Sequence, residues 1–371
     1  MNATFLIAAF CVFALKLYLI FRQNQQLAQR PDESVMAVAR LKILLGRECT
    51  DFILFTFCLL FMLDMLARKP LLEGGLITLG LACGVGFIRW VMFDLRLWLL
   101  MKKQGQAKDS FAHYSYKSAQ RMGRAMMVAA PVLLVALLLI EQQSYAVLCF
   151  FIFFSLWAQQ IVGPLFKARV FSELLPAQEQ PLGGIQVFED IESRNNTHAN
   201  ARAHAGFKEP FVVYTHGLKA LLEKEEFLSV LAHEKGHILH HHHLKWVAYQ
   251  GACLCLSFLM FITLVKMTGW EINSSSPILL AIVGYSYVDF LLMPFSSRLM
   301  HRFEFQADDQ AACDMGAGVF VDALRKIIGQ NLTPMRDDPL YSLFYSTHPS
   351  AQDRIRRLLP DKTTAHEVSQ V

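Results

Sequence analysis

"LAHEKGHILHHHHLKWVAYQ", residues 231–250, carries six of the 13 histidines in the chain. Its first part repeats apolar residues at helical spacing, and from about residue 247 the chain becomes a long apolar run. Two histidines four residues apart, with a Glu directly after the first, are typical of a metal site, whereas a long apolar run is typical of a membrane helix. The stretch therefore predicts a metal site beside a membrane segment.

The composition indicates a membrane protein. Of the 371 residues, 54% are hydrophobic and 18% are charged, and the mean hydropathy is +0.33. A soluble enzyme of this length is usually less apolar. The net charge of +4 is small, and no basic cluster is interleaved with aromatic residues, so we expect no nucleic-acid partner.

The apolar residues are gathered in blocks that compare with the roughly 20 residues of a membrane-spanning helix. Seven runs can be read along the chain: 4–21, 52–66, 75–100, 125–141, 145–171, 247–267 and 277–297. No basic segment precedes the first run and no small-residue cleavage site follows it, so we interpret it as a retained span. The predicted fold class is an α-helical multi-pass membrane protein with about seven transmembrane helices.

Lysine and arginine are concentrated in alternate connecting loops. The loops after the first and third runs are rich in these residues, and the loops after the second, fourth and sixth runs are poor in them. Because basic loops stay on the cytoplasmic side, we expect the N-terminus outside and the long segments after the fifth and seventh runs in the cytoplasm.

These two long segments are polar enough to fold together outside the lipid. The expected division is 1–171 for five transmembrane helices, 172–246 for the first part of a catalytic domain, 247–297 for helices six and seven, and 298–371 for the second part of that domain. In the first part, extended pieces near 183–191, 199–206 and 210–215 precede a helix-like stretch over 216–243. We therefore expect a small, mainly helical domain with a short β-sheet.

His233, Glu234 and His237 form the pattern H-E-x-x-H on a segment with helical spacing. Residues four apart share one face of a helix, so both imidazoles can reach one Zn²⁺ while Glu234 contacts the water bound to it. The same pattern with three fixed positions also occurs by chance in unrelated chains. A third ligand is needed to support the metal site.

One candidate third ligand is His243, which has the spacing of the longer motif H-E-x-x-H-x-x-G-x-x-H. The Gly of that motif, which lets the helix turn, is replaced here by His240. A straight helix would place His243 about 600° of rotation past His237, on a different side. We interpret residues 240–243 as an interfacial or solvated cluster.

The better candidate is Glu304, which lies four residues before Asp308 on a predicted helix. Two His and one Glu with an open fourth position are typical of catalytic zinc. Asp308 would accept the other N–H of a ligating His and hold its tautomer. An ordinary solvated acidic helix face is the alternative.

At this point a family resemblance becomes specific. "HEKGH" (233–237), "EFQAD" (304–308) and "STHPSAQDRIRRL" (346–358) resemble the zinc metallopeptidase family of the type-1 CAAX prenyl proteases and the HtpX-type proteases. "NTHANARAHAG" (196–206) is similar to a strand of that family, and "GPLF" (163–166) also matches, so the likeness covers about 160–358. Five spans before the histidine motif and two after it resemble the prenyl protease group.

The resemblance implies a role for each matched residue. His233, His237 and Glu304 would be the zinc ligands, Glu234 the general base, His348 the oxyanion stabiliser, and Arg354 a residue that binds substrate or orients the site. The edge strand of Asn200, Ala201, Arg202 and Ala203 would pair with an extended substrate. The chain departs from the family pattern at two places: Met300 and His301 replace the Ser-Arg often found before the ligand Glu, and the strand is one residue longer before its glycine.

Charged residues inside the runs need partners, because a charge facing acyl chains costs at least about 2.5–3.5 kcal/mol. These residues are Asp64, Arg89, Asp94 and Asp289. Arg89 and Asp94 are five apart and do not sit over one another on a helix, so their partners must be water or other spans. The resemblance implies a water-filled chamber between the spans; helix packing with charges paired between spans is the alternative.

We therefore expect a zinc metalloendopeptidase in a membrane, with its catalytic domain facing the cytoplasm, in the inner membrane of a bacterium or the endoplasmic reticulum of a eukaryote. The expected cofactor is Zn²⁺, and the expected partners are the lipid bilayer and a polypeptide substrate, lipidated or membrane-bound. An HtpX-like quality-control protease with four spans and a proteolytically silent membrane scaffold are the alternatives.

Overall fold

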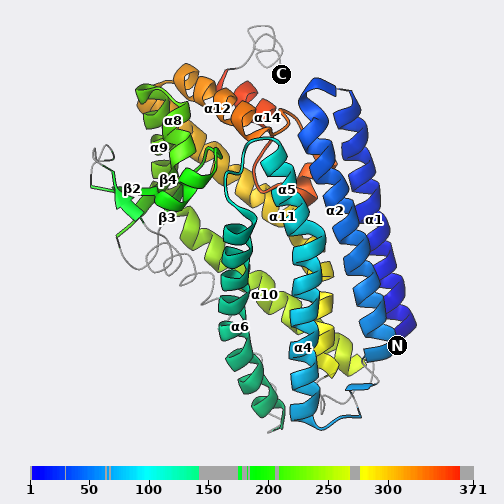
Figure 1. Cartoon of the computed structure of the whole chain (residues 1–371). Coiled ribbons are helices and arrows are strands. Elements are labelled where there is room, and N and C mark those ends of the chain that lie inside the picture. The colour runs from blue at the N-terminus through cyan, green and yellow to red at the C-terminus, as the bar shows by residue number, and fades with distance from the viewer. Residues whose placement is uncertain are drawn as a thin grey trace.

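The computed structural model describes residues 2–29, 31–62, 65–66, 68–141, 174–177, 182, 184–204, 209–267 and 276–359. Over these residues the chain is mostly helical with one small sheet (Figure 1), as the predicted fold class requires. The fifth predicted run, 145–171, and the 163–166 motif lie outside the described residues, as does Asp64.

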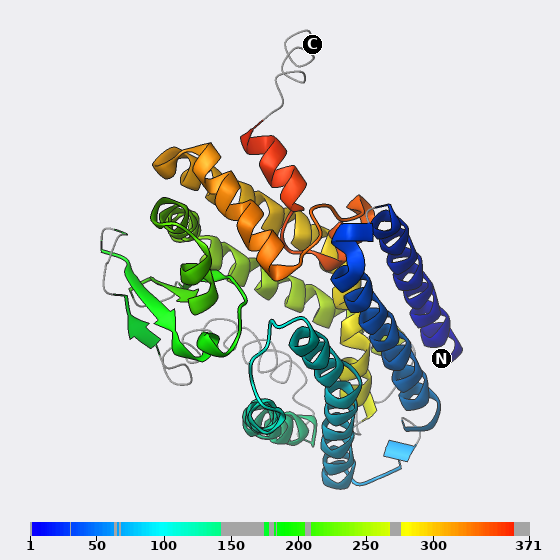
Figure 2. The ribbon, with the colours of Figure 1, turned by 45° about the horizontal axis from the view of Figure 1, so that its top comes forward.

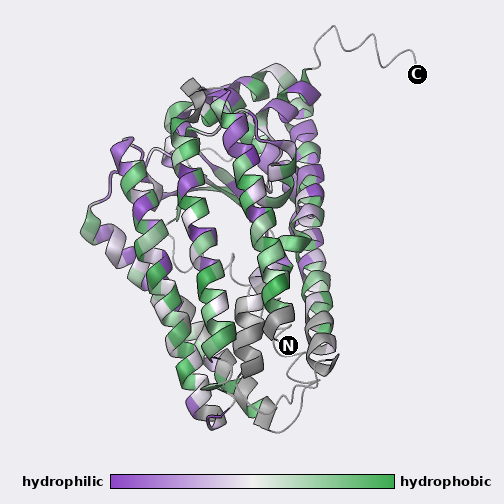
Figure 3. Cartoon of the chain, turned by 90° about the vertical axis from the view of Figure 1, so that its right-hand side faces the viewer, coloured by the Kyte–Doolittle hydropathy of each residue, from purple (hydrophilic) through white to green (hydrophobic). Residues whose placement is uncertain are grey.

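Long helices carry the other six apolar runs. They are α1 (Asn2–Ala28), α2 (Pro31–Phe57), α4 (Leu71–Arg89), α5 (Leu95–Lys103), α6 (Phe111–Glu141), α10 (His242–Met267) and α11 (Ser276–Met315). One π-helical turn (Cys58–Met62) extends α2, and another (Trp90–Asp94) joins α4 to α5. Figure 3 shows that hydrophobic residues dominate the lower parts of these helices, whereas hydrophilic residues gather at the top of the molecule.

Two stretches among the described helices, Phe5–Ala28 and Glu73–Lys103, are long and apolar enough to cross a membrane by length and composition. The first coincides with the first predicted run and the second with the third. The count of seven spans therefore stays a prediction.

The basic segment after the first run is a helix rather than the expected loop. α2 begins at Pro31, and Arg40 and Arg47 lie on it. Apolar residues recur on one face of this helix and pack against α1, in a cluster of Ile20, Leu27, Ala37 and Leu41. Because this face is buried against α1, the basic segment belongs to the helix bundle and forms one helix with the start of the second run.

The sheet has the order β1-β2-β4-β3, with β2 parallel to β4 and the outer two strands antiparallel to their neighbours. The strands are β1 (Leu174–Pro176), β2 (Gln186–Asp190), β3 (Ala201–His204) and β4 (Phe211–Thr215). Val187, Val212 and Tyr214 turn into the core, and β3 lies at the edge of the sheet. The predicted short sheet is confirmed, and residues 201–204 form its edge strand.

The helix expected over 216–243 is divided into three. α8 (His216–Leu221) ends where Leu222 is extended, α9 (Lys224–Leu239) follows, and α10 begins at His242. The break at the start of α9 has a local cause, because the side chains of Glu223 and Glu226 form a reciprocal capping box. The break at its end places His241 at a positive φ of 52°.

Three further helices complete the polar part of the molecule: α12 (Ala317–Asn331), α13 (Pro339–Tyr345) and α14 (Ala351–Leu358). Their core joins the sheet to α9 and α11 through a cluster that includes Val212, Leu231, Ala311 and Phe320. In Figure 2, α9 and the sheet lie beside α12 and α11, and the long helices extend away from them. Residues from the segments before and after α10 thus share one hydrophobic core.

α13 ties this domain to the first helix of the bundle. Arg22 binds the carboxylate of Asp338 with Nη2 and Oδ2 2.8 Å apart, and the Gln23 amide donates to Oδ1 of Asp337 at 2.6 Å. The backbone N–H of Asp338 in turn donates to Oε1 of Gln23 at 2.7 Å. Because α13 leads directly to His348, α1 helps to fix the segment that carries this residue.

Two ion pairs join neighbouring long helices. Lys16 of α1 contacts Glu48 of α2 at 2.6 Å, and Nη2 of Arg89 contacts Oδ1 of Asp51 at 2.7 Å. Arg89 therefore finds its partner on another helix, as one of the two expected solutions requires. The water-filled chamber stays a prediction.

The close approach of α9 to α11 requires a glycine. A Cβ on Gly236 would lie 2.9 Å from Cα of Ala307 and 3.0 Å from Cβ of Gln310. Because the atom at 2.9 Å belongs to the backbone of α11, a side chain at residue 236 would force the whole helix to move. The two helices that carry the candidate metal ligands are thus in direct backbone contact.

We expect Gly236→Ala to lower the free energy of unfolding by about 1–3 kcal/mol, because the added methyl must separate α9 from α11. The matched control is Gly329→Ala on α12, where a Cβ meets nothing within 4 Å and Ala should be neutral or stabilising by up to about 1 kcal/mol. Thermal unfolding of the detergent-purified variants measures both. Equal Tm values for the two variants would contradict the tight contact.

Candidate metal centre

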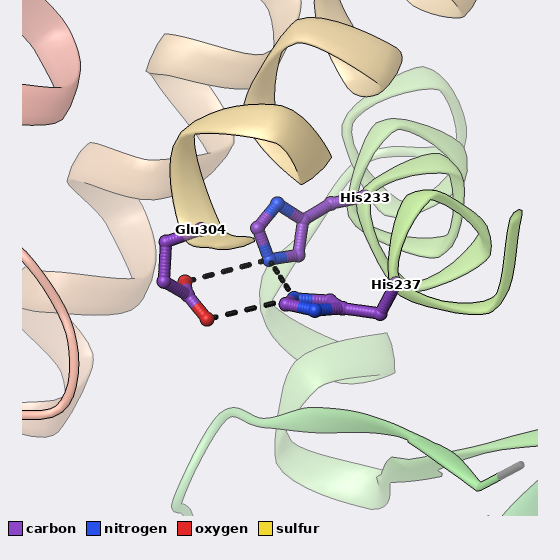
Figure 4. Close-up of side chains that lie close together, drawn as sticks. All are labelled: His233, His237 and Glu304. Atoms are coloured by element: carbon purple, nitrogen blue, oxygen red, sulfur yellow. Dashed lines mark hydrogen bonds and ion pairs between the residues drawn. The ribbon is translucent and has the colours of Figure 1, made fainter. Parts of the chain in front are cut away.

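Three side chains converge between α9 and α11. His233 and His237 lie one turn apart on α9, and Glu304 faces them from α11 (Figure 4). The two Nε2 atoms are 3.2 Å apart, and the Glu304 carboxylate oxygens lie 3.6 Å from Nε2 of His233 and 3.5 Å from Nε2 of His237. These are the three residues that the sequence predicts as metal ligands.

These separations fit a tetrahedral metal ion. Ligand atoms placed 2.0–2.1 Å from a tetrahedral Zn²⁺ lie roughly 3.3–3.4 Å from one another. All three ligand atoms lie within 4.8 Å of one another, and the individual distances agree with the edges of such a tetrahedron. Two His and one carboxylate are the donor set of catalytic zinc sites, which keep one position open.

The side chain of Asp308 lies behind His233. Oδ1 of Asp308 is 3.0 Å from Nδ1 of His233, an ion-pair distance at which the geometry falls short of a regular hydrogen bond. Arg354 binds the same carboxylate with two hydrogen bonds, from Nε at 2.9 Å and from Nη2 at 2.5 Å. Arg354 therefore holds Asp308, and Asp308 holds the outer nitrogen of His233.

The protonation of His237 and Glu304 suits metal ligation. Burial and the charge of His233 lower the pKa of His237 to about 3, so its imidazole is neutral. Burial alone would raise the pKa of Glu304, but contact with His348 and the charge of Arg354 outweigh it and lower the pKa well below the usual range. Burial also opposes protonation of His233, but the contact with Asp308 and the charge of Glu304 raise its pKa.

Glu234 is buried beside the ligands and is held by the edge strand. Its Oε2 accepts the backbone N–H of Ala203 at 2.6 Å, and 9% of the residue is exposed. Burial raises the pKa of this carboxyl group above its usual value. A carboxylate with a raised pKa is a better proton acceptor at neutral pH, as a general base requires.

A cleft of about 500 Å³ opens in front of the three ligands. The edge strand lines one side of it, with Asn200, Ala201, Arg202 and Ala203. The carbonyl of Asn200 accepts a hydrogen bond from Thr215 of β4, whereas the N–H of Ala203 points to Glu234. Because strand residues alternate, the backbone groups of Ala201 and Ala203 face the cleft.

The structure brings the remaining predicted residues to the same cleft. His348 is 66% exposed at its side chain, and its Nδ1 lies 3.0 Å from Oε2 of Glu304. Arg354 is 11% exposed and its Nη1 lies 3.7 Å from the same oxygen. Of the two roles expected for Arg354, orienting the site agrees better with this burial than direct contact with substrate.

The histidines after α9 separate into two kinds. His243 lies on the wall of the cleft and is absent from the converging group of described residues, which agrees with rejecting it as a ligand. His242, however, is 3% exposed and its Nδ1 lies 3.0 Å from Nδ1 of His237. Of the expected interfacial or solvated cluster, the solvated interpretation is therefore wrong for His242. A straight-helix projection missed this contact because the chain turns at His241.

His301, which departs from the family pattern, has a structural partner. Its Nε2 lies 3.0 Å from the backbone carbonyl of Ser346. Ser346 ends α13, two residues before His348. His301 therefore supports the segment that carries His348 from the side of α11.

The chain is similar to known peptidases in sequence and in fold. The sequence profile described as Peptidase family M48 matches residues 168–361, just over half of the chain. The CAAX prenyl protease 1 homolog of Arabidopsis thaliana is 32% identical over 178 residues, which cover 45% of this chain and 41% of that protein. The corresponding protein of Oryza sativa is 27% identical over 266 residues, covering 62% of this chain and 60% of that protein.

The same region is also similar to a Protease HtpX homolog of Sulfurihydrogenibium, with 28% identity over 177 residues that cover 40% of this chain and 59% of that protein. The chain thus matches about two fifths to three fifths of the length of these relatives. Among solved structures, S. mikatae Ste24p has a TM-score of 0.81, 18% identity, and coverage of 96% of this chain and 99% of that one. At that identity the likeness shows a shared fold.

We expect Asp308→Ala to lower the free energy of unfolding by about 3–5 kcal/mol, because it removes the main partner of the buried Arg354. The matched control is Asp309→Ala, which breaks the pair between Asp309 and Arg357 at the surface, with 53% and 41% of the side chains exposed. That change should cost no more than about 1 kcal/mol. Thermal unfolding of the two variants checks the difference, and similar Tm losses would contradict it.

Proposed function

The chain belongs to peptidase family M48, and we propose that it is a membrane-embedded zinc metalloendopeptidase of the CAAX prenyl protease type. One observation carries the proposal. Nε2 of His233, Nε2 of His237 and the Glu304 carboxylate lie at the separations of a tetrahedral metal site, and Glu234 is buried next to them.

In this proposal His233, His237 and Glu304 hold the zinc ion. When bound, zinc acts as a Lewis acid and lowers the pKa of a bound water from 15.7 towards about 7. Asp308 and Arg354 keep His233 in place from behind. A neutral His237 and an ionised Glu304, both favoured by their pKa shifts, leave their lone pairs available to the metal.

Glu234 acts as the general base of peptide hydrolysis. It takes a proton from the attacking water on Oε1, since Oε2 already accepts the Ala203 N–H, and delivers the proton to the leaving amine. Such transfer typically contributes a factor of about 10²–10⁴ in rate. His348, exposed in the cleft, donates to the oxygen of the scissile carbonyl as negative charge develops there.

The edge strand binds the substrate in an extended form. Ala201 and Ala203 present backbone groups to the cleft, and a substrate strand can pair with them as an added strand of the sheet. Asn200 and Arg202 flank these contacts. Recognition through backbone groups accepts many sequences, so the cleft suits a polypeptide that is delivered by a lipid or by a membrane segment.

The proposed placement is a multi-pass protein whose catalytic domain faces the cytoplasm. The domain would be built from 172–246 and 298–371, with transmembrane helices in 1–171 and 247–297. An HtpX-type assignment has less support, because the matches that cover more of this chain are to proteins named CAAX prenyl protease 1. A scaffold without proteolytic activity would not require His233, His237 and Glu304 to converge, so their convergence favours an enzyme.

We expect Glu234→Gln to reduce peptide cleavage by about 10²–10⁴-fold while zinc stays bound, because the amide cannot accept the proton. Glu225→Gln, an exposed change on the same helix, is the matched control and should leave cleavage unchanged. The assay offers prenylated and plain peptides to the detergent-purified protein, with zinc measured by elemental analysis. Full activity of Glu234→Gln would reject the proposed base.

We expect Glu304→Ala to lose zinc, because only two protein ligands remain. The zinc content of this variant should fall well below that of the wild type after dialysis against a chelator. Cleavage should fall with it and should not return at stoichiometric zinc. A Glu304→Ala variant with a full complement of zinc would remove this residue from the ligand set.

A further inference from the structure

The ring nitrogen of His237 that faces away from the proposed metal also has a partner, His242. Its Nδ1, the ring nitrogen opposite Nε2, lies 3.0 Å from Nδ1 of His242. Nε2 of His242 lies 2.8 Å from Oε1 of Gln306. His242 is 3% exposed, so both contacts are shielded from water, and an unmatched donor or acceptor there would be costly.

A break between α9 and α10 brings His242 next to His237. On a straight helix, a residue five positions on is rotated by about 500° and faces a different side. Here α9 ends at Leu239, His241 adopts φ 52°, and α10 begins at His242. A non-glycine residue in this region is uncommon and is often found at a functional site.

A single turn of α11 supports this arrangement. The ring of His242 stacks on Phe303, with centroids 4.3 Å apart and planes 13° apart. Phe303 directly precedes Glu304, and Gln306 follows two residues later. The segment that supplies the third ligand therefore also fixes the position of His242.

The proton positions form one consistent chain. A neutral imidazole with a metal on Nε2 carries its proton on Nδ1, so His237 must donate from Nδ1. Nδ1 of His242 can accept this hydrogen bond only if the proton of His242 is on its Nε2. That Nε2–H then donates to the carbonyl oxygen of Gln306. With the Gln306 amide turned over, two Nδ1–H donors would face each other.

We propose that His242 is a positioning residue for His237, and that Gln306 sets the tautomer in which His242 accepts. The proposal rests on the proposed function, because it takes His237 as a zinc ligand. Metal-bound His usually donates its other N–H to a carboxylate, a backbone carbonyl or water, and loss of that partner typically lowers metal affinity by about 10–100-fold. For His237 the acceptor is the neutral imidazole of His242. For His233 it is the carboxylate of Asp308.

The test measures zinc affinity by competition with a chelator in detergent. His242→Phe keeps the aromatic stack on Phe303 but removes the acceptor, and should raise the zinc dissociation constant by about 10–100-fold. His242→Asn restores an acceptor oxygen near the position of Nδ1 and should recover most of the affinity. Gln306→Leu should give an intermediate loss. His240→Phe, a change in the same run of histidines, is the matched control.

Each outcome has a distinct meaning. If the wild type binds no zinc, the proposed function fails and this inference with it. If the wild type binds zinc, and His242→Phe binds it as tightly as His240→Phe does, the inference alone is overturned. If His242→Phe does not fold by circular dichroism, the comparison of His242→Asn with Gln306→Leu decides, and equal wild-type affinity in both would overturn the inference.

Discussion

The site depends on the contact between the backbones of α9 and α11. Gly236 on one helix meets Ala307 on the other, and a Cβ on the glycine would approach Cα of Ala307 to 2.9 Å. His237 follows the glycine, and Glu304 lies one turn before the alanine. The interhelical distance therefore sets the distance between the ligands. A larger residue at Gly236 would push α11 away from α9, and would therefore move Glu304 away from the imidazoles.

The long helices of the bundle also help to position the residues of the site. α11 is continuous from the seventh apolar run to Met315, so the position of Glu304 is fixed by a helix rooted in the bundle. On the other side of the cleft, His348 follows α13, which Arg22 and Gln23 of α1 hold by its N-terminus. Glu304 and His348, on two sides of the cleft, are thus positioned by helices of the bundle.

Much of the site was predictable from local patterns, and the rest was not, for physical reasons. The spacing of His233 and His237 and the pairing of Glu304 with Asp308 follow from helical periodicity, which is a local property. The role of Arg354 as the partner of Asp308 is a contact between distant segments. His242 was missed because its contact requires a positive φ at His241, which no helical projection contains. The helical form of the basic segment around Arg40 was missed because its buried face becomes visible only when α1 packs against it.

The charge of the site explains why such a cluster can exist in a folded protein. Among the described residues around the ligand atoms, three buried carboxylates, Glu234, Glu304 and Asp308, face one buried guanidinium, that of Arg354. In the charge state that binds a metal, with Glu234 ionised and both imidazoles neutral, two negative charges are in excess, and uncompensated buried charge strongly destabilises a fold. A divalent cation held by His233, His237 and Glu304 would cancel that excess. Its binding free energy would then add to the stability of the α9–α11 contact, so the site and the fold around it would be stabilised by the same ion.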